Sequence, residues 1–211
     1  MKRIVIHLFI SISLIFFGLT ITKSNHALEP ENIVGAWLFD EGEGELVKDS
    51  SDNGNDGTIV DEPEWVKGKF GNALEFDGQS GSIEISDSES LNNVDDLTIL
   101  AWVLLKREVT SGTWNCLAGK NPYASGYLMW IQVPSEPCGL VYVGGGRFDN
   151  RSGVQIDKDE WYHLAFTRVH DGEMKFFING EMVKVAQSNK GAISTRSEER
   201  RVGKECVSEC R

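Results

Sequence analysis

The chain has 211 residues, a formal net charge of −11 and 40% hydrophobic residues, which is enough to bury the core of one ordinary domain. Without the two chain ends discussed below, which carry +3 and +1, residues 28–195 have a net charge of −15. That excess argues against nucleic acid or another polyanion as a partner, because affinity for phosphates comes from Lys and Arg. Neutral glycans, calcium and simple solubility are all compatible with it.

The N-terminal segment has the layout of an export signal. Met1–Arg3 is basic, Ile4–Thr22 contains no acidic residue, Lys or Arg, and small and polar residues follow as far as Ala27. This order predicts a secretory signal peptide over 1–27. The alternative is an uncleaved membrane anchor, because a span needs about 20 apolar residues. We therefore expect a secreted or cell-surface protein, with membrane contact only if this segment is retained.

Short alternating runs separated by glycine and acidic turns fill residues 28–195. Apolar and polar positions alternate with period two, which is typical of half-buried antiparallel strands. The predicted strands are 33–39, 57–60, 72–76, 82–86, 97–105, 115–118, 127–133, 139–143, 161–169, 173–178 and 181–186. Asn179-Gly180 predicts a two-residue turn before the last of them, because both residues tolerate positive φ. With no convincing helical period, the pattern favours an all-β, two-sheet antiparallel sandwich.

Several of these segments, in this order, resemble the laminin-G-like (concanavalin A-like) jelly roll. The segments that carry the resemblance are 35–42, 68–78, 97–103, 161–165 and 174–181. The resemblance implies one or two further strands after the last hairpin, including a C-terminal strand beside the first. These strands are missing from the pattern, so we expect a jelly roll without its last strand or strands.

The C-terminal segment breaks the strand pattern. Arg196–Cys206 has no apolar periodicity and matches the translation of a sequencing adapter, whose opening AGATCGGAAGAG encodes Arg-Ser-Glu-Glu. We therefore expect 196–211 to be a non-native tail and the domain to occupy 28–195. The alternative is a natural basic tail.

Two cysteines, Cys116 and Cys138, remain once the tail is set aside. In an exported chain such a pair can form a disulfide that stabilises by about 2–4 kcal/mol. Buried thiols inside the sandwich are the alternative.

Carboxylates gather around the glycine turns between residues 40 and 77. Calcium takes six to eight oxygen ligands, which flexible acidic loops can supply. The resemblance implies a structural calcium near the first strand, and Asp40 and Asp77 are the ligands we expect. The alternative is a solvated acidic face on which Asp and Asn serve as turn residues.

Aromatic residues crowd the middle of the chain, and aromatic rings can stack on sugars. We expect Trp114 and Tyr123, beside turn residues, to contact a ligand, with Asn121 and Arg151 bonding its hydroxyls. Gln132 and Asn150 are further candidates, whereas Tyr127 and Trp130 are expected to fill the core. The resemblance implies core positions for Trp37, Trp102 and Trp161 and a structural role for His163.

Catalytic patterns are weak in this sequence. Glycoside hydrolysis generally needs two carboxylates about 5–10 Å apart, and the nearest approach is Glu75-Phe76-Asp77, which runs into a turn. We therefore predict a secreted, non-catalytic recognition module for a glycan or an extracellular protein. The alternatives are an accessory module of a larger carbohydrate-active enzyme and a structural adhesion or spacer domain.

Overall fold

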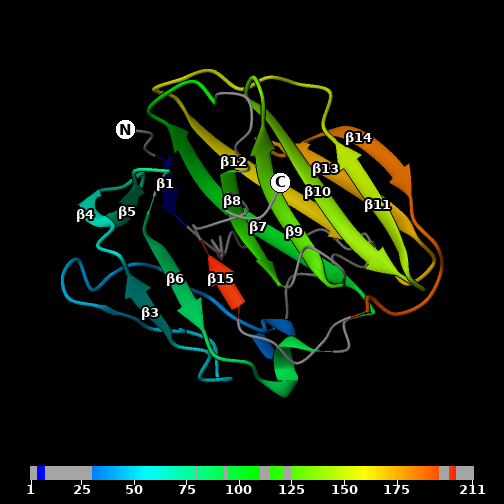
Figure 1. The fold of residues 1–211 in the computed structure, drawn as a ribbon, viewed down its shortest axis with the longest axis horizontal. Coiled ribbons are helices and arrows are strands. Elements are labelled where there is room, and N and C mark those ends of the chain that lie inside the picture. The colour runs from blue at the N-terminus through cyan, green and yellow to red at the C-terminus, as the bar shows by residue number, and fades with distance from the viewer. Residues whose placement is uncertain are drawn as a thin grey trace, which may run out of the picture.

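Two antiparallel sheets pack face to face in the computed structural model (Figure 1). It describes residues 4–7, 30–78, 80–92, 95–109, 115–120, 125–194 and 200–202. The front sheet in Figure 1 has eight strands, ordered β11-β10-β9-β8-β15-β6-β3-β2, and the back sheet has seven, ordered β14-β13-β12-β7-β1-β5-β4. The predicted all-β, two-sheet sandwich is confirmed.

Short strands supply nearly all of the regular structure. The front-sheet strands are β2 (Leu46–Val47), β3 (Gly57–Val60), β6 (Ser82–Ile85), β8 (Asn115–Lys120), β9 (Tyr127–Gln132), β10 (Glu136–Val143), β11 (Gly146–Arg151) and β15 (Arg200–Val202). The back-sheet strands are β1 (Ile4–His7), β4 (Glu64–Lys67), β5 (Asn72–Phe76), β7 (Leu97–Leu105), β12 (Trp161–Arg168), β13 (Glu173–Ile178) and β14 (Glu181–Gln187). Two 3₁₀ turns, η1 (Pro30–Asn32) and η2 (Glu89–Leu91), complete the described elements. Among these residues, no helix is long and apolar enough to cross a bilayer.

The main core lies between the two sheets and follows from the alternation in the sequence. On β7 the positions Ala101, Val103 and Leu105 are at most 1% exposed and belong to this core. On β9 the positions Met129 and Ile131 enter it from the opposite sheet. Each strand therefore presents one residue in two to the partner sheet, as period-two patterns require.

The predicted Asn-Gly turn is confirmed. Asn179 and Gly180 both have positive φ, 53° and 85°, and they join β13 to β14 with Ile178 paired to Glu181. A two-residue turn of this kind matches the twist of the flanking strands. It fixes the register of the edge strand β14.

The expected first strand, 33–39, is largely absent. Only Trp37 makes a bridge, to Asp49, because side chains rather than a strand satisfy the backbone here. Asp49 accepts hydrogen bonds from the amides of Ala36 (2.8 Å), Ser51 (2.9 Å) and Asn55 (2.9 Å). The carboxylate thus replaces a neighbouring strand as the hydrogen-bond partner.

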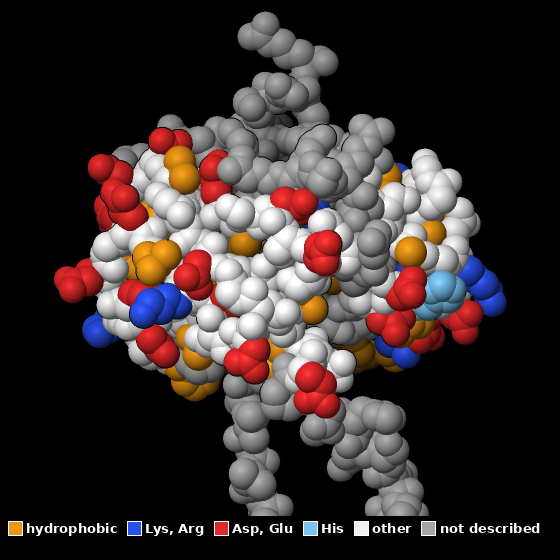
Figure 2. Space-filling model, turned by 90° about the horizontal axis from the view of Figure 1, so that it is seen from below, with side chains coloured by type: hydrophobic (Ala, Val, Ile, Leu, Met, Phe, Trp, Pro, Cys, Tyr) orange, Lys and Arg blue, Asp and Glu red, His pale blue; other side chains and the backbone are white. Residues whose placement is uncertain are grey.

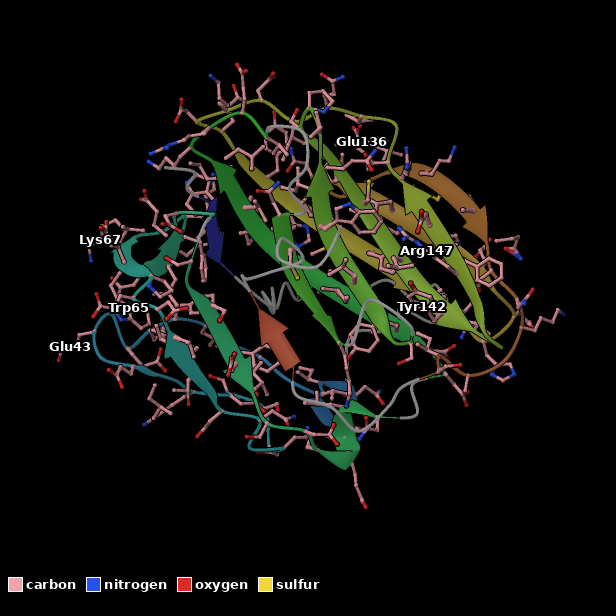
Figure 3. The ribbon with its side chains drawn as sticks, viewed as in Figure 1. Glu43, Trp65, Lys67, Glu136, Tyr142 and Arg147 are labelled. Atoms are coloured by element: carbon pink, nitrogen blue, oxygen red, sulfur yellow. The ribbon has the colours of Figure 1, made fainter. Side chains whose placement is uncertain are left out.

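The acidic loop between Asp40 and Gly57 is held by such local bonds. Asn55 is 4% exposed and donates to the carbonyl of Val34 at 2.7 Å. The indole of Trp65, on β4, donates to the carbonyl of Gly44 at 2.9 Å; Figure 3 places Trp65 beside Lys67, with Glu43 farther out. Acidic and amide side chains of this loop, such as Asp49 and Asn55, therefore have hydrogen-bond partners within the protein.

Both chain ends contribute a short strand to the interior of a sheet. Ile4–His7, within the predicted signal peptide, pairs with β5 and β7. Arg200–Val202, within the predicted tail, pairs with β6 and β8. The remainder of both segments lies outside the described residues, and their identity as leader and non-native tail stays a prediction.

Candidate functional site

The front sheet buries a second apolar cluster on its outer face, away from the main core. Met129 and Val141 point between the sheets. Because side chains alternate along a strand, their neighbours Trp130 and Leu140 point to the opposite side of the front sheet. We call this group the outer cluster: Cys116, Leu128, Trp130, Cys138, Leu140 and Tyr142. Each member is at most 8% exposed. The middle of this face is therefore apolar and closely packed.

The edge strand β11 places a polar row beside the outer cluster. Phe148 packs against the main core, so Arg147, Asp149 and Arg151 share the outer face. Their cross-strand partners on β10 are Tyr142, Leu140 and Cys138, in that order. We call Arg147, Asp149 and Arg151 the β11 polar row. It forms the charged border of an apolar sheet face.

Arg147 and Asp149 form a two-point ion pair within this row. Nε of Arg147 donates to Oδ1 of Asp149 at 2.9 Å, and Nη2 donates to Oδ2 at 3.3 Å. Burial alone would lower the pKa of the guanidinium, but Asp149 and Tyr142 outweigh it and raise that pKa. Figure 3 shows Tyr142 and Arg147 side by side over β10 and β11. The pair is fixed in position yet 40% and 29% exposed, so both groups can reach a ligand.

A second polar group lies at the start of β10. Gln132 donates to Oε2 of Glu136 at 2.7 Å, and the amide of Gly153 donates to Oε1 at 2.8 Å. Figure 3 places Glu136 at the opposite end of β10 from Tyr142. The outer face thus carries hydrogen-bonding groups at both ends of a buried apolar cluster, and these polar groups are the part of the face that a small polar ligand could reach.

The ligand residues expected from the sequence meet different outcomes. Trp114, Asn121 and Tyr123 lie outside the described residues, so their role stays a prediction. Arg151 is exposed on the β11 polar row, and Gln132 is beside Glu136. The structure therefore brings Arg151 and Gln132 to the same face.

Asn150 is corrected. It is 0% exposed, and neither its amide nitrogen nor its amide oxygen has a hydrogen-bond partner. Because it alternates with Asp149 and Arg151, it points between the sheets rather than outward. It therefore cannot bond the hydroxyls of a ligand on the outer face.

Tyr142, Arg147 and Asp149 were missed, although the sequence holds a signal for them. Gly144 and Gly145 both have positive φ, 57° and 78°, and join Val143 to Gly146 across a two-residue hairpin. Reading Gly-Gly as such a turn would have predicted β11 and placed Tyr142 opposite Arg147.

The tryptophans divide between the two sides of the sheets. Trp130 is buried, as predicted, but belongs to the outer cluster. Trp102 lies on the outer face of the back sheet, because its neighbours on β7 face the core, and this corrects its expected core position. Its ring is 5.2 Å from that of His163 and 5.7 Å from that of Phe70. Burial lowers the pKa of His163, consistent with a packing role.

The two expected calcium ligands are not brought together. Asn72 donates to the carbonyl of Asp40 at 3.4 Å, which places Asp40 at the start of β5, whereas Asp77 follows the end of that strand. Five residues of extended chain separate these ends by roughly 17 Å. One cation therefore could not contact both carboxylates. Within the described ranges, no group of three or more His, Cys, Asp or Glu could hold a metal ion, and calcium stays a prediction.

The expected disulfide is corrected. Cys116 and Cys138 are buried thiols on β8 and β10, each paired with Trp130 on the strand between them. Adjacent strands are about 4.8 Å apart, so the two Cα atoms are about 9–10 Å apart. A disulfide needs Cα atoms closer than about 7 Å. The intervening strand prevents the bond.

We expect the Cys138 thiol to be unreactive in the folded protein. Burial, assisted by Glu136, raises its pKa to about 12, and thiolate is the reactive form. Iodoacetamide at pH 8 should modify Cys138 only after denaturation, as read by peptide mass spectrometry with and without urea. Cys138 stays protonated in the folded state at a pH at which it ionises in the unfolded state. The free energy of unfolding should therefore fall as the pH rises above 9. A Cys116–Cys138 cross-linked peptide would contradict this assignment.

The comparisons with known proteins agree with the fold. The family model described as the concanavalin A-like lectin/glucanases superfamily matches residues 77–208, which include part of the predicted tail. No curated protein gives a significant match.

Solved structures share the fold at low sequence identity. Domain 4 of AbnA, an extracellular arabinanase from Geobacillus stearothermophilus solved with arabinotriose, has a TM-score of 0.61 and 19% identity, covering 80% of this chain and 82% of that one. The binding domain of Paraclostridial Mosquitocidal Protein 1 has a TM-score of 0.58 and 16% identity, with 76% and 45% covered. The binding domain of botulinum neurotoxin serotype D/C has a TM-score of 0.57 and 12% identity, with 82% and 43% covered.

The chain thus spans less than half of the toxin binding domains but most of the arabinanase domain. Because more than half of its residues match the family model, and the two-sheet sandwich agrees with it, the chain belongs to the concanavalin A-like lectin/glucanases superfamily.

Proposed function

We propose that this chain is an exported, non-catalytic module that binds a neutral oligosaccharide on the outer face of its front sheet. The observation that carries the proposal is the β11 polar row, which lies along the outer cluster with Arg147 and Asp149 held in a fixed pair. Small-ligand sites rely on a few precisely placed polar groups, and the β11 polar row supplies such groups at the exposed border of the buried outer cluster.

The charge of the site favours a neutral ligand. Arg147 and Arg151 are balanced on this face by Asp149 and Glu136, while residues 28–195 have a net charge of −15. Figure 2 shows acidic side chains spread over the lower face of the molecule and few basic ones. A polyanionic glycan would be repelled at long range, whereas sugar hydroxyls can both accept from guanidinium and donate to carboxylate.

Similar proteins support a glycan as the partner. The arabinanase domain was solved with arabinotriose, and the binding domain of a botulinum neurotoxin, with a TM-score of 0.52, was solved in complex with a sialyl glycan. The first similarity also supports a second candidate function, an accessory module of an extracellular carbohydrate-active enzyme. Both functions require export, for which the predicted signal peptide is the remaining support.

The spacing of carboxylates supports a non-catalytic site. Asp149 is paired with Leu140, and Glu136 lies four residues earlier on β10. Four residues of extended strand correspond to about 13 Å, whereas glycosidases hold their carboxylates about 5–10 Å apart. Both carboxylates also accept hydrogen bonds from neighbouring residues. We therefore assign them to ligand binding or support.

We expect Arg147→Ala to weaken oligosaccharide binding about tenfold or more, because a hydrogen bond to a charged group contributes about 1.5–3 kcal/mol. A glycan array selects the ligand, with arabinotriose as the first probe, and calorimetry then compares wild type with the variant. Lys190→Ala is the matched control, because it removes an exposed ion pair with Asp171 elsewhere on the surface.

Each outcome of this comparison separates the candidate functions. If the Arg147→Ala variant binds the glycan as tightly as wild type does, the glycan site lies away from the β11 polar row. Absence of binding to any glycan would favour the spacer function or an extracellular protein as partner. Loss in Arg147→Ala, with Lys190→Ala unchanged, supports the proposed site.

A further inference from the structure

We propose that the side chains of Lys120 and Asn92 join in a covalent amide bond, with Asp87 as the group that transfers the protons. Lys120 is the last residue of β8, and its side chain is 0% exposed. Its Nζ donates to Oδ1 of Asp87 and to Oδ1 of Asn92. Lysine is seldom fully buried unless it is paired, and here it is paired with the two groups that this reaction needs.

The three side chains meet at one edge of the front sheet, on its inner side. Lys120 is paired with Tyr127 on β9 and aligned through β15 with Ile85 on β6, and both of these neighbours belong to the main core. Directly paired side chains share one face of a sheet, so Lys120 points between the sheets. Asp87 and Asn92 lie on either side of η2, which follows β6. The end of β8 and the segment after β6 therefore supply the reacting groups.

The amide of Asn92 has the orientation that the reaction requires. Its oxygen faces Lys120, and its nitrogen donates to Oδ1 and Oδ2 of Asp87 at 3.2 and 3.4 Å. The carbon Cγ, which the amine attacks, is one C=O bond of about 1.2 Å from the oxygen that Nζ contacts. The backbone amide of Asn92 donates to the carbonyl of Glu89 at 3.0 Å and holds the residue in place. Such positioning of the reacting atoms favours bond formation.

Asp87 contacts both the nitrogen that enters and the nitrogen that leaves. It first accepts a proton from Nζ of Lys120, which leaves a neutral amine. The lone pair of Nζ then forms a bond to Cγ of Asn92, and the π electrons of the C=O bond move onto Oδ1. Asp87 gives its proton to Nδ2 and takes a second proton from Nζ.

The bond between Cγ and Nδ2 of Asn92 then breaks, its electron pair stays on the nitrogen, and the C=O bond re-forms. The second proton leaves with the ammonia as ammonium, so Asp87 is again a carboxylate. The reaction needs no oxidant, reductant or further reactant, because an amide is exchanged for an amide.

The new bond would join two strands that are not neighbours. It connects β8 to the segment after β6, and β15 lies between these strands in the sheet (Figure 1). The linked residues are 28 positions apart, so the bond restricts the unfolded chain as a disulfide does. Unlike a disulfide, it resists reducing agents. The domain would thus gain a covalent tie that Cys116 and Cys138 cannot provide.

Intact mass spectrometry of the full chain tests the proposal, on fresh protein and after prolonged incubation in the folded state. We expect a mass below that of the sequence by one ammonia molecule. Tryptic digestion locates the bond, because trypsin does not cut after an acylated lysine. Residues 70–106 and 108–147 should therefore appear as one branched peptide. A succinimide at an Asn-Gly pair loses the same mass but gives no branch.

The variants Lys120→Arg, Asn92→Ala and Asp87→Asn should each have the full mass of their own sequence and no branched peptide. Circular dichroism checks that each is folded. Lys67 and Asn72 are the internal control, because Nζ and Oδ1 are 3.1 Å apart at an exposed site. Trypsin should still cut after Lys67.

Two results would overturn the proposal. Wild type that keeps its full mass after incubation, with complete tryptic cleavage after Lys120, holds only an ion pair at this place. A branched peptide that forms equally in Asp87→Asn would remove the assigned role of the carboxylate. The wild-type measurement decides the first point even if a variant fails to fold, and neither result depends on glycan binding.

Discussion

Replacing Arg168 with alanine is expected to lower the free energy of unfolding by about 4 kcal/mol. Arg168, at the end of β12, is fully buried, 0% exposed. Its guanidinium donates to the carbonyls of Asp95 and Gly191 at 2.5 Å each, and of Asn189 at 3.0 Å. Alanine would leave these buried acceptors without donors, and each such loss costs about 1–3 kcal/mol.

The contribution of Arg168 is to join distant parts of the chain. Its partners precede and follow it by 73 and 23 residues, so one side chain ties the entry to β7 and the segment after β14 to the same strand. Burial lowers the pKa of the guanidinium, and the nearby Asp96 and Asp95 oppose that shift. The group remains charged throughout the ordinary pH range, so its effect on stability should not depend on pH between 5 and 9.

Urea unfolding followed by circular dichroism measures this effect. Lys190→Ala is again the control, since Lys190 and Asp171 form an ion pair whose side chains are 76% and 80% exposed, and such pairs contribute about 0–1 kcal/mol. Arg168→Lys tests geometry, because lysine keeps the charge but cannot reach three carbonyls in one plane. A loss below 1 kcal/mol in Arg168→Ala would show that the two segments hold together without it.

Period two was sufficient to predict most of the sheets. β5, β7 and β13 have the predicted bounds, because each alternates clearly and ends at a turn residue. The segment 33–39 alternates equally well but is not a strand, since Asp49 satisfies its backbone from a loop. Alternation reports which side chains are buried, and it does not report which group accepts the backbone hydrogen bonds.

The candidate site was harder to predict than the fold. Arg151 could be named from its residue type, but its alignment with Arg147 and Asp149 depends on a register set by the Gly144-Gly145 turn. Asn150 was assigned to the wrong side because a strand that is not recognised gives no alternation to apply. The separation of Cys116 from Cys138 likewise depends on β9 lying between them, which sequence spacing does not reveal.

Gly139→Ala is the second substitution with a large expected effect, a loss of about 3 kcal/mol in unfolding free energy. Gly139 lies on β10 between Met129 of β9 and Asn150 of β11. A Cβ atom at this position would lie 2.5 Å from Cγ and Cε2 of Phe166. Overpacking of a tight core costs about 1–3 kcal/mol, and the upper end applies here because strands on both sides hold β10 in place.

The ring of Phe166 has little room to withdraw from an added methyl group. It is 0% exposed and stacks on Phe176 with ring centroids 6.2 Å apart. Phe166→Leu removes ring atoms from the contact, so Gly139→Ala should cost at least 1 kcal/mol less in that background than in wild type. A double-mutant cycle by urea unfolding measures this coupling. If the effects of the two substitutions on the free energy of unfolding are additive, β10 moves to accommodate the added methyl group. In that case the glycine at 139 is not needed to make room for the ring of Phe166 between the sheets.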